Sequence, residues 1–167
     1  MPLSMYELTI PAMLRGIGIL SSYMDKAAHY AEEKGIDPTV LINARLAPDM
    51  LPLSGQIQRF SDNCKGSIAR FAITNSPSFP DTEETFADLK ERLAKTATFL
   101  KTIKPEQLEG SEQRTIEVKL RGLNATLSGQ EYLLFVVLPN IYFHMTTTHD
   151  ILRHNGMNIG KMDYLGR

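Results

Sequence analysis

The chain has 167 residues, of which 43% are hydrophobic and 22% are charged, and its formal net charge is −1. This length matches one domain with a substantial core, so we assign residues 1–167 to a single domain. A net charge near zero gives no electrostatic argument for nucleic acid or an anionic membrane as a partner, and we expect neither. The net charge does not exclude a small basic patch on the surface.

The single cysteine, Cys64, rules out an internal disulfide and is typical of a reducing compartment. The first ten residues do not have the pattern of a signal peptide, and the longest apolar stretch, 132–138, is too short to cross a bilayer. We therefore expect a cytoplasmic protein. As the only thiol, Cys64 is a candidate nucleophile, but apart from Lys65 no neighbour in the sequence would lower its pKa. A small buried hydrophobe is therefore the commoner interpretation of this residue.

The first predicted element is a helix over residues 4–34, whose apolar positions keep helical spacing. Pro11 lies inside this pattern and marks a kink or the true first turn. Gly35 suits a left-handed cap at the end of the helix. Gly16 and Gly18 weaken a helix, and we expect them to permit close approach of another helix, in this chain or across a dimer.

A short connector follows, and Asp37 before Pro38 predicts its helical start. The second long helix is predicted over residues 50–74. Gln56 is unusual there because it lies on the apolar stripe of the helix. A buried glutamine needs hydrogen-bond partners for its amide, so Gln56 becomes a candidate site residue.

The segment 75–85 is predicted to be a loop with two prolines, ending in a helix cap at Asp81 or Thr82. The third long helix is predicted over residues 83–103. Its charged residues are expected to form a solvated face, as such runs usually do. They are Lys90, Glu91, Arg92 and Lys95.

After Pro105 the pattern changes from helical spacing to alternation. Residues 114–120 and 125–129 predict two strands of a short β-hairpin, which must pack on helices because two strands alone are marginal. A long apolar helix is predicted over residues 130–156, followed by an irregular tail. Four amphipathic helices with one hairpin before the last predict an all-α four-helix bundle.

The last helix carries three of the four histidines, which suggests a metal site until their spacing is considered. Two histidines grip one ion from a helix when they are four residues apart, whereas His144, His149 and His154 follow one another at intervals of five. Neither pair converges on one ion. Asn140, one turn before His144, is the better neighbour for it.

Each histidine also has a structural interpretation. His154 caps helix carbonyls near the end of its helix, His149 is a flank or interface residue, and His29 is exposed or half-exposed. His144 borders the bundle interior, and the sequence leaves open whether it is a hydrogen-bonded core residue or a functional one.

A resemblance covers almost the whole chain and rests on five segments: MPLSMYELTIPAMLRG, ARLAPDMLPLSGQIQ, LRGLNATLSGQEYLL, LPNIYFHMTTTHDILRHNG and GKMDYLG. As a set they resemble an uncharacterised bacterial branch, a domain of unknown function, of the DinB/YfiT-like superfamily. The resemblance implies a DinB-like four-helix bundle with the hairpin inserted before the last helix. It also implies a divalent metal, since members of the superfamily often bind one.

Members of the superfamily typically carry one histidine on the second helix and an HxxxHRGQ-like run on the last helix, leading to LRxxG. Residues 152–156, LRHNG, match that ending, and counting back from them places the second histidine of the run on His144. The first then falls on Asn140, and the ligand of the second helix falls on Gln56. Amides are poor ligands for zinc or nickel, so these replacements argue against a tight metal site, and the cofactor is left open between zinc or nickel and none.

Three functions follow as expectations. The first is a small-molecule-binding protein with a pocket around Gln56, Asn140 and His144, where a degenerate metal site remains and any catalysis uses His144 as general acid or base. The second is a non-catalytic interaction module, expected to form a homodimer. The third, implied only by the resemblance, is a metal-dependent thiol transferase or isomerase, and the loss of two histidines argues against it.

Overall fold

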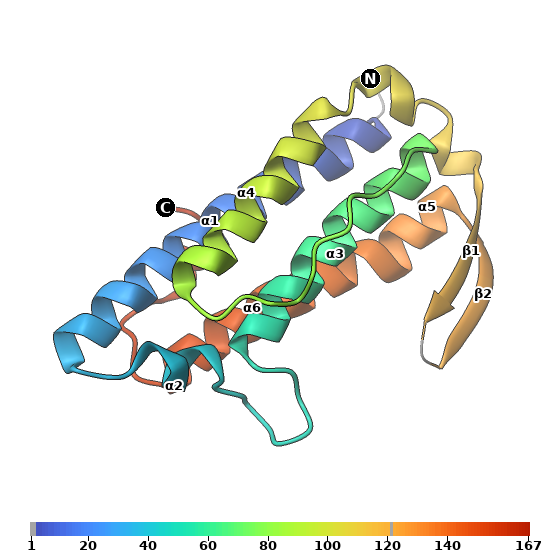
Figure 1. Ribbon diagram of the computed structural model, residues 1–167. Coiled ribbons are helices and arrows are strands. Elements are labelled where there is room, and N and C mark those ends of the chain that lie inside the picture. The colour runs from blue at the N-terminus through green and yellow to red at the C-terminus, as the bar shows by residue number, and fades with distance from the viewer. Residues whose placement is uncertain (1–2, 121) are drawn as a thin grey trace.

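The computed structural model describes residues 3–120 and 122–167, in which four long helices lie side by side (Figure 1). The elements in chain order are α1 (Met5–Lys34), α2 (Pro38–Ile42), α3 (Leu53–Ala72), α4 (Phe86–Thr102), the 3₁₀ turns η1 (Pro105–Leu108) and η2 (Ser111–Gln113), β1 (Thr115–Leu120), β2 (Leu123–Ser128), α5 (Gly129–Tyr132), a π-helical turn (Leu133–Val137), α6 (Leu138–His154) and α7 (Lys161–Tyr164). The predicted bundle with a hairpin before the last helix is confirmed.

Local sequence signals explain where the helices begin and end. At the start of α1 the Ser4 hydroxyl accepts from the Glu7 amide while the Glu7 carboxylate accepts from the Ser4 amide, and Gly35 ends the helix in the left-handed conformation. The N-cap of α4 is Thr85, so the prediction of Asp81 or Thr82 is wrong. The reason is tertiary, since the Asp81 carboxylate forms ion pairs with arginines instead of capping the helix.

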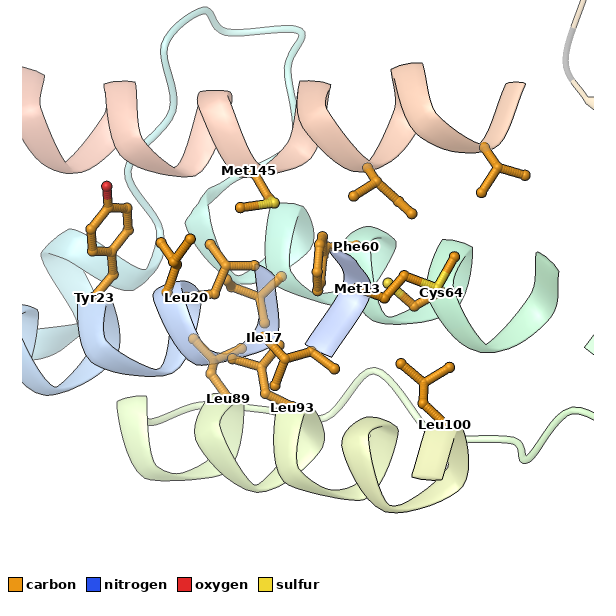
Figure 2. Packing of buried hydrophobic residues seen from close by; sticks show 14 of the residues in the cluster. Met13, Ile17, Leu20, Tyr23, Phe60, Cys64, Leu89, Leu93, Leu100 and Met145 are labelled. Atoms are coloured by element: carbon orange, nitrogen blue, oxygen red, sulfur yellow. The ribbon is translucent and has the colours of Figure 1, made fainter. Parts of the chain in front are cut away.

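The hydrophobic core lies between α1, α3, α4 and α6 (Figure 2). α1 packs mainly against α4, and α3 packs against both α4 and α6. Burial of such large apolar side chains is the main source of stability for a bundle of this size. Core side chains with 4% exposure or less come from each long helix: Leu20, Phe60, Leu93 and Met145.

The two glycines of α1 differ in what surrounds them. A Cβ atom on Gly16 would lie 2.9 Å from the Met145 sulfur and 3.0 Å from the Phe60 ring, so the missing side chain lets α1 approach α3 and α6. Gly18 is exposed, and a Cβ atom there would meet no described atom within 4 Å. Close approach within the chain is therefore found at Gly16 and not at Gly18.

The hairpin packs on the helices through one face. β1 pairs with β2 in an antiparallel register that sets Val118 opposite Ala125, and the side chains of Ile116 and Val118 are buried. The hairpin leads directly into α5, whose first residue, Gly129, lies against the backbone of Ser111 in η2. This contact fixes the hairpin relative to the last helix.

The last helix is continuous from α5 to α6 but contains the π-helical turn Leu133–Val137, in which the Leu138 amide donates to the Leu133 carbonyl, five residues back. Pro139 follows this turn at once. Proline has no amide hydrogen and its ring clashes with a carbonyl four residues earlier, so the wider turn accommodates it within the helix.

Large apolar side chains on the outer face of the last helix are exposed to solvent. Phe135 is 69% exposed and Phe143 is 54% exposed, and Leu134 and Tyr142 are almost as open. We name these four residues the outer apolar face. Within the described residues, none of the helices is both long enough and apolar enough to cross a membrane.

Candidate functional site

The structure brings together two of the three predicted site residues, Gln56 of α3 and His144 of α6. The His144 Nδ1 atom lies 2.8 Å from the Gln56 Oε1 atom, and both side chains are buried, with 1% exposure for Gln56 and 8% for His144. The two residues face each other because α3 and α6 pack side by side. Gln56, the polar residue on the apolar stripe of α3, thus has a hydrogen-bond partner in His144 on α6.

The hydrogen bonds determine which imidazole nitrogen carries the proton. The Gln56 Nε2 atom donates to the Leu51 carbonyl at 3.0 Å, so its Oε1 atom is the one that faces His144. An amide oxygen only accepts, and the His144 Nδ1 atom must therefore be protonated. In a neutral imidazole this leaves a lone pair on Nε2. Gln56 thereby orients His144 and fixes its tautomer.

The Nε2 atom of His144, unlike its Nδ1 atom, has no hydrogen-bond partner among the described residues and is not fully buried. Within residues 3–120 and 122–167 no hydrogen bond to it is found, and the one fully buried side-chain polar atom without a partner there is Arg92 Nε. The His144 Nε2 atom therefore keeps contact with the surface. Burial, and secondarily the positive charge of Arg59, lowers the pKa of His144 to about 4. At pH 7 this side chain is a neutral hydrogen-bond acceptor.

The lowered pKa predicts a loss of stability in mild acid. As pH falls through about 6.5 the unfolded chain protonates His144, whereas the folded chain does so only near pH 4, so the free energy of unfolding should fall by about 2 kcal/mol between pH 7 and pH 5. Urea unfolding at pH 7, 6 and 5 measures this slope. The H144Q variant should lose this pH dependence of stability, whereas H154Q should keep it. An unchanged slope in H144Q would contradict the assignment of the pH dependence to His144.

Asn140, the third predicted residue, does not join the pair through a hydrogen bond. It is half-buried, and its Nδ2 atom donates to the Val136 carbonyl of its own helix at 2.7 Å. The amide of Gln56 is occupied by Leu51 and His144. One imidazole and two engaged amides do not fit the three-histidine metal site that the resemblance implies. Among the described residues, no three or more His, Cys, Asp or Glu side chains are grouped to hold a metal ion.

The remaining candidates lie elsewhere. The His149 Nδ1 atom is 2.7 Å from the buried Tyr23 hydroxyl, on the other side of the helix from the pair. His154 and His29 are exposed. Cys64 is fully buried, and burial raises the pKa of its thiol, so the thiolate needed for nucleophilic chemistry does not form at neutral pH.

A row of mostly polar residues continues from the Gln56–His144 pair toward the hairpin. We name this row the α3–α6 seam. It consists of Gln56, Arg59, Asn63 and Arg70 on α3 and of Tyr132, Val136, Asn140 and His144 on the last helix.

A cavity of about 240 Å³ opens at the hairpin end of the α3–α6 seam. Its walls come from α3, from β1 and from the last helix, and they include Arg59, Arg70, Lys119 and Tyr132. Neither this cavity nor four others of about 220–910 Å³ in the described part of the chain are lined by Gln56, Asn140 or His144.

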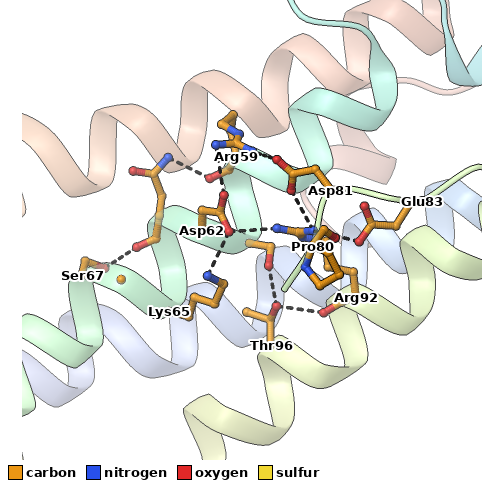
Figure 3. A network of polar contacts seen from close by, with 12 residues as sticks. Arg59, Asp62, Lys65, Ser67, Pro80, Asp81, Glu83, Arg92 and Thr96 are labelled. Atoms are coloured by element: carbon orange, nitrogen blue, oxygen red, sulfur yellow. Dashed lines mark hydrogen bonds and ion pairs between the residues drawn. The ribbon is translucent and has the colours of Figure 1, made fainter. Parts of the chain in front are cut away.

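A cluster of ion pairs lies beside the seam and joins α3, α4 and the loop between them (Figure 3). Its centre is Arg92, whose side chain is 1% exposed, which corrects the prediction that Arg92 belongs to the solvated face of its helix. The Asp62 carboxylate receives contacts from Arg59, Lys65 and Arg92. Asp62 therefore connects the cluster to the cavity, which it also lines.

Sequence reasoning missed the cavity residues because they come from three separate elements. The available signal was weak: Arg59 and Asn63 follow Gln56 by three and seven residues and so share its side of α3. Nothing in the sequence joined Lys119 or Tyr132 to that side, since the position of the hairpin is set by tertiary packing.

Comparisons with known proteins agree over nearly the whole chain. A family model described as a domain of unknown function, DUF1993, matches residues 5–165. The chain is also similar to a crystal structure of a DinB family member protein from Shewanella denitrificans, at 35% sequence identity and a TM-score of 0.91, with coverage of 97% of this chain and 92% of that chain. No match was found among curated proteins.

Proposed function

Because the chain belongs to the DUF1993 family and has the DinB-like fold, we propose that it binds a small molecule along the α3–α6 seam, with His144 as an acceptor for the ligand. The observation that carries the proposal is the state of His144: a neutral imidazole, oriented by Gln56, whose Nε2 lone pair has no partner among the described residues. The adjoining cavity supplies space for the ligand. We place the protein in the cytoplasm, which its single cysteine supports.

The chemistry proposed for His144 is hydrogen bonding, with no metal-dependent step. A general base works best when its pKa is near the working pH, and a pKa of about 4 makes His144 a weak base at pH 7. The amides of Gln56 and Asn140 replace the histidines of a superfamily metal site, so we propose that this metal site is degenerate and derive no thiol-transfer chemistry from it. His144 thus anchors a donor group of the ligand.

A library screen tests the proposal. Small organic metabolites are added to the wild type, to H144Q and to H154Q, and binding is followed by ligand-observed NMR. We expect at least one compound that binds the wild type and H154Q but loses its signal with H144Q. Hits that all persist in H144Q, or no hits at all, would overturn the proposal. In the same preparations Zn²⁺ and Ni²⁺ should raise the melting temperature by less than about 1 °C, because a ligand that binds only the folded state stabilises it.

A second candidate function, a homodimeric interaction module, is favoured by the outer apolar face. Residues 132–149 contain no Asp, Glu, Lys or Arg, so this face offers no charge to steer an oppositely charged partner. A second copy of the chain has the same uncharged face, and the two can pair around a two-fold axis. The exposed Phe135, Tyr142 and Phe143 are the aromatic residues that such interfaces favour.

Dimerisation through this face predicts a sharp response to charge. The wild type should sediment as a dimer at about 10 µM, and a variant with both F135E and F143E should have a dimer dissociation constant at least about 100-fold higher, since two buried carboxylates per chain oppose association. V40E, at an apolar residue exposed on α2, serves as the matched control and should remain dimeric. A monomeric wild type would reject this candidate.

A further inference from the structure

The cavity at the hairpin end of the α3–α6 seam has a composition that points to the class of its ligand. Its volume of about 240 Å³ equals that of about eight water molecules, enough for one small polar group and too little for a large organic molecule. Three of its lining residues are cationic, namely Arg59, Arg70 and Lys119, and one, Asp62, is anionic.

The positive charge of the cavity is not cancelled within the chain. Asp62 is shared by Arg59, Lys65 and Arg92, and Arg59 contacts the Asp81 carboxylate as well. Within the described residues, Arg70 and Lys119 form no ion pair with a carboxylate. Two of the three cations that line the cavity therefore have no carboxylate partner in the described part of the chain.

Tyr132 supplies a fixed neutral donor beside these cations. Its hydroxyl oxygen accepts from Arg70 Nη1 at 3.1 Å, and the Arg70 guanidinium lies 5.8 Å from the centre of the Tyr132 ring. The ring is 6% exposed and packs edge-on against Phe71 at 5.5 Å between centroids. The hydroxyl proton of Tyr132 has no acceptor among the described residues, so it remains available to a ligand oxygen.

We propose that this cavity binds an oxyanion, a carboxylate or phosphate group, through Arg70, Lys119 and the Tyr132 hydroxyl. The inference rests on the proposed function and specifies its ligand. The anionic end lies at the hairpin, and the other end extends past Asn140 toward His144, which is eight residues and therefore about 12 Å along the helix from Val136. Guanidinium, ammonium and hydroxyl donors together match the several lone pairs of such a group.

An NMR titration tests the anion site directly. ¹⁵N-labelled protein is titrated with sodium phosphate and, separately, with sodium acetate, with sodium chloride added to keep the ionic strength constant. We expect saturable shifts at the Arg70 Nε–H and at the backbone amides of Asn63, Lys119 and Tyr132 with at least one of the two anions. If acetate saturates the site, the anionic group of the ligand is a carboxylate, and if phosphate saturates it, that group is a phosphate. If neither anion saturates the site, the proposal is overturned.

Substitutions separate this site from general charge effects and from the site at His144. R70Q and Y132F should each weaken binding at least fivefold, whereas K101Q, which removes an exposed lysine of α4, should not change it. Equal weakening by all three variants would reject the cavity as the site. The anion titration is read at the hairpin end of the seam, whereas the metabolite screen is read as loss of signal in H144Q, so failure of the anion site and failure of the proposed function are distinguishable results.

Discussion

Replacing Arg92 with methionine is expected to lower the free energy of unfolding by about 3–5 kcal/mol, the usual cost of removing one partner from a buried ion pair. Arg92 lies 2.9 Å from Asp62, and its Nη1 atom is 2.8 Å from Glu83 and also donates to the Pro80 carbonyl (Figure 3). Methionine fills much of the same volume. The expected loss therefore comes from carboxylates that lose a cationic partner, above all Glu83, whose side chain is 9% exposed and which then keeps the neutral Gln58 amide as a donor.

The pH dependence of the Arg92 variant identifies the source of the loss. Burial by itself raises the pKa of Glu83, but hydrogen bonds from Arg92 and Gln58 outweigh it, so the net pKa lies below the ordinary value. Because the pKa of Glu83 is lower in the folded state, its ionised carboxylate stabilises the fold at any pH above the unfolded-state pKa of about 4.3. This stabilisation is lost as the pH falls through the folded-state pKa. The difference between wild type and variant should therefore be large at pH 7 and smaller below pH 4.

Urea unfolding followed by circular dichroism at pH 7 and at pH 3.5 measures both effects. K95M is the matched control, because Lys95 is 57% exposed and, among the described residues, its one ion pair is with Glu91, at 2.6 Å, one turn away on the same helix. Such a surface pair contributes about 0.3–0.5 kcal/mol. A loss below about 1 kcal/mol in R92M, or an equal loss in K95M, would show that the buried cluster does not stabilise the fold.

The fold was predictable from the sequence where local signals decide it. Helical spacing, the Gly35 cap and the change to alternation after Pro105 each act within a few residues, and the structure follows them. Arg92 was misassigned because spacing treats every charged residue as solvated. Its burial depends on the loop between α3 and α4, which brings Asp81 and Glu83 to it.

The site was predictable only in part for the same reason. Gln56 stood out as a polar residue on an apolar stripe, but only the resemblance to the superfamily motif placed it in one site with His144, its hydrogen-bond partner in the structure. Asn140 lies one turn from His144, as spacing requires, but its amide bonds to its own helix. The π-helical turn rotates the side chains that precede it around the helix axis relative to those that follow it, and the spacing of apolar residues in the sequence does not predict this rotation. Tyr132 precedes that turn and therefore escaped notice as a site residue.

Substituting alanine for Gly129 is expected to lower the free energy of unfolding by about 3 kcal/mol, the upper range for overpacking, and the melting temperature by about 6–12 °C. A Cβ atom there would lie 1.8 Å from the Ser111 carbonyl oxygen. The obstacle is backbone rather than a flexible side chain, so η2 or the start of α5 must move. The higher helix propensity of alanine, about 1 kcal/mol, does not compensate for this movement.

G18A is the matched control for G129A, since Gly18 is exposed on α1 and an added Cβ atom would meet no described atom within 4 Å. It should raise the free energy of unfolding by about 0.5–1 kcal/mol through helix propensity alone. If the contact at Ser111 is rigid, thermal unfolding should give a lower melting temperature than the wild type for G129A and a higher one for G18A. G129A should also weaken binding of whichever of the two anions saturates the wild type, because Gly129 fixes the hairpin that carries Lys119. A G129A variant as stable as the wild type would mean that this wall of the cavity moves freely, and the three donors would then not be held together before the anion binds.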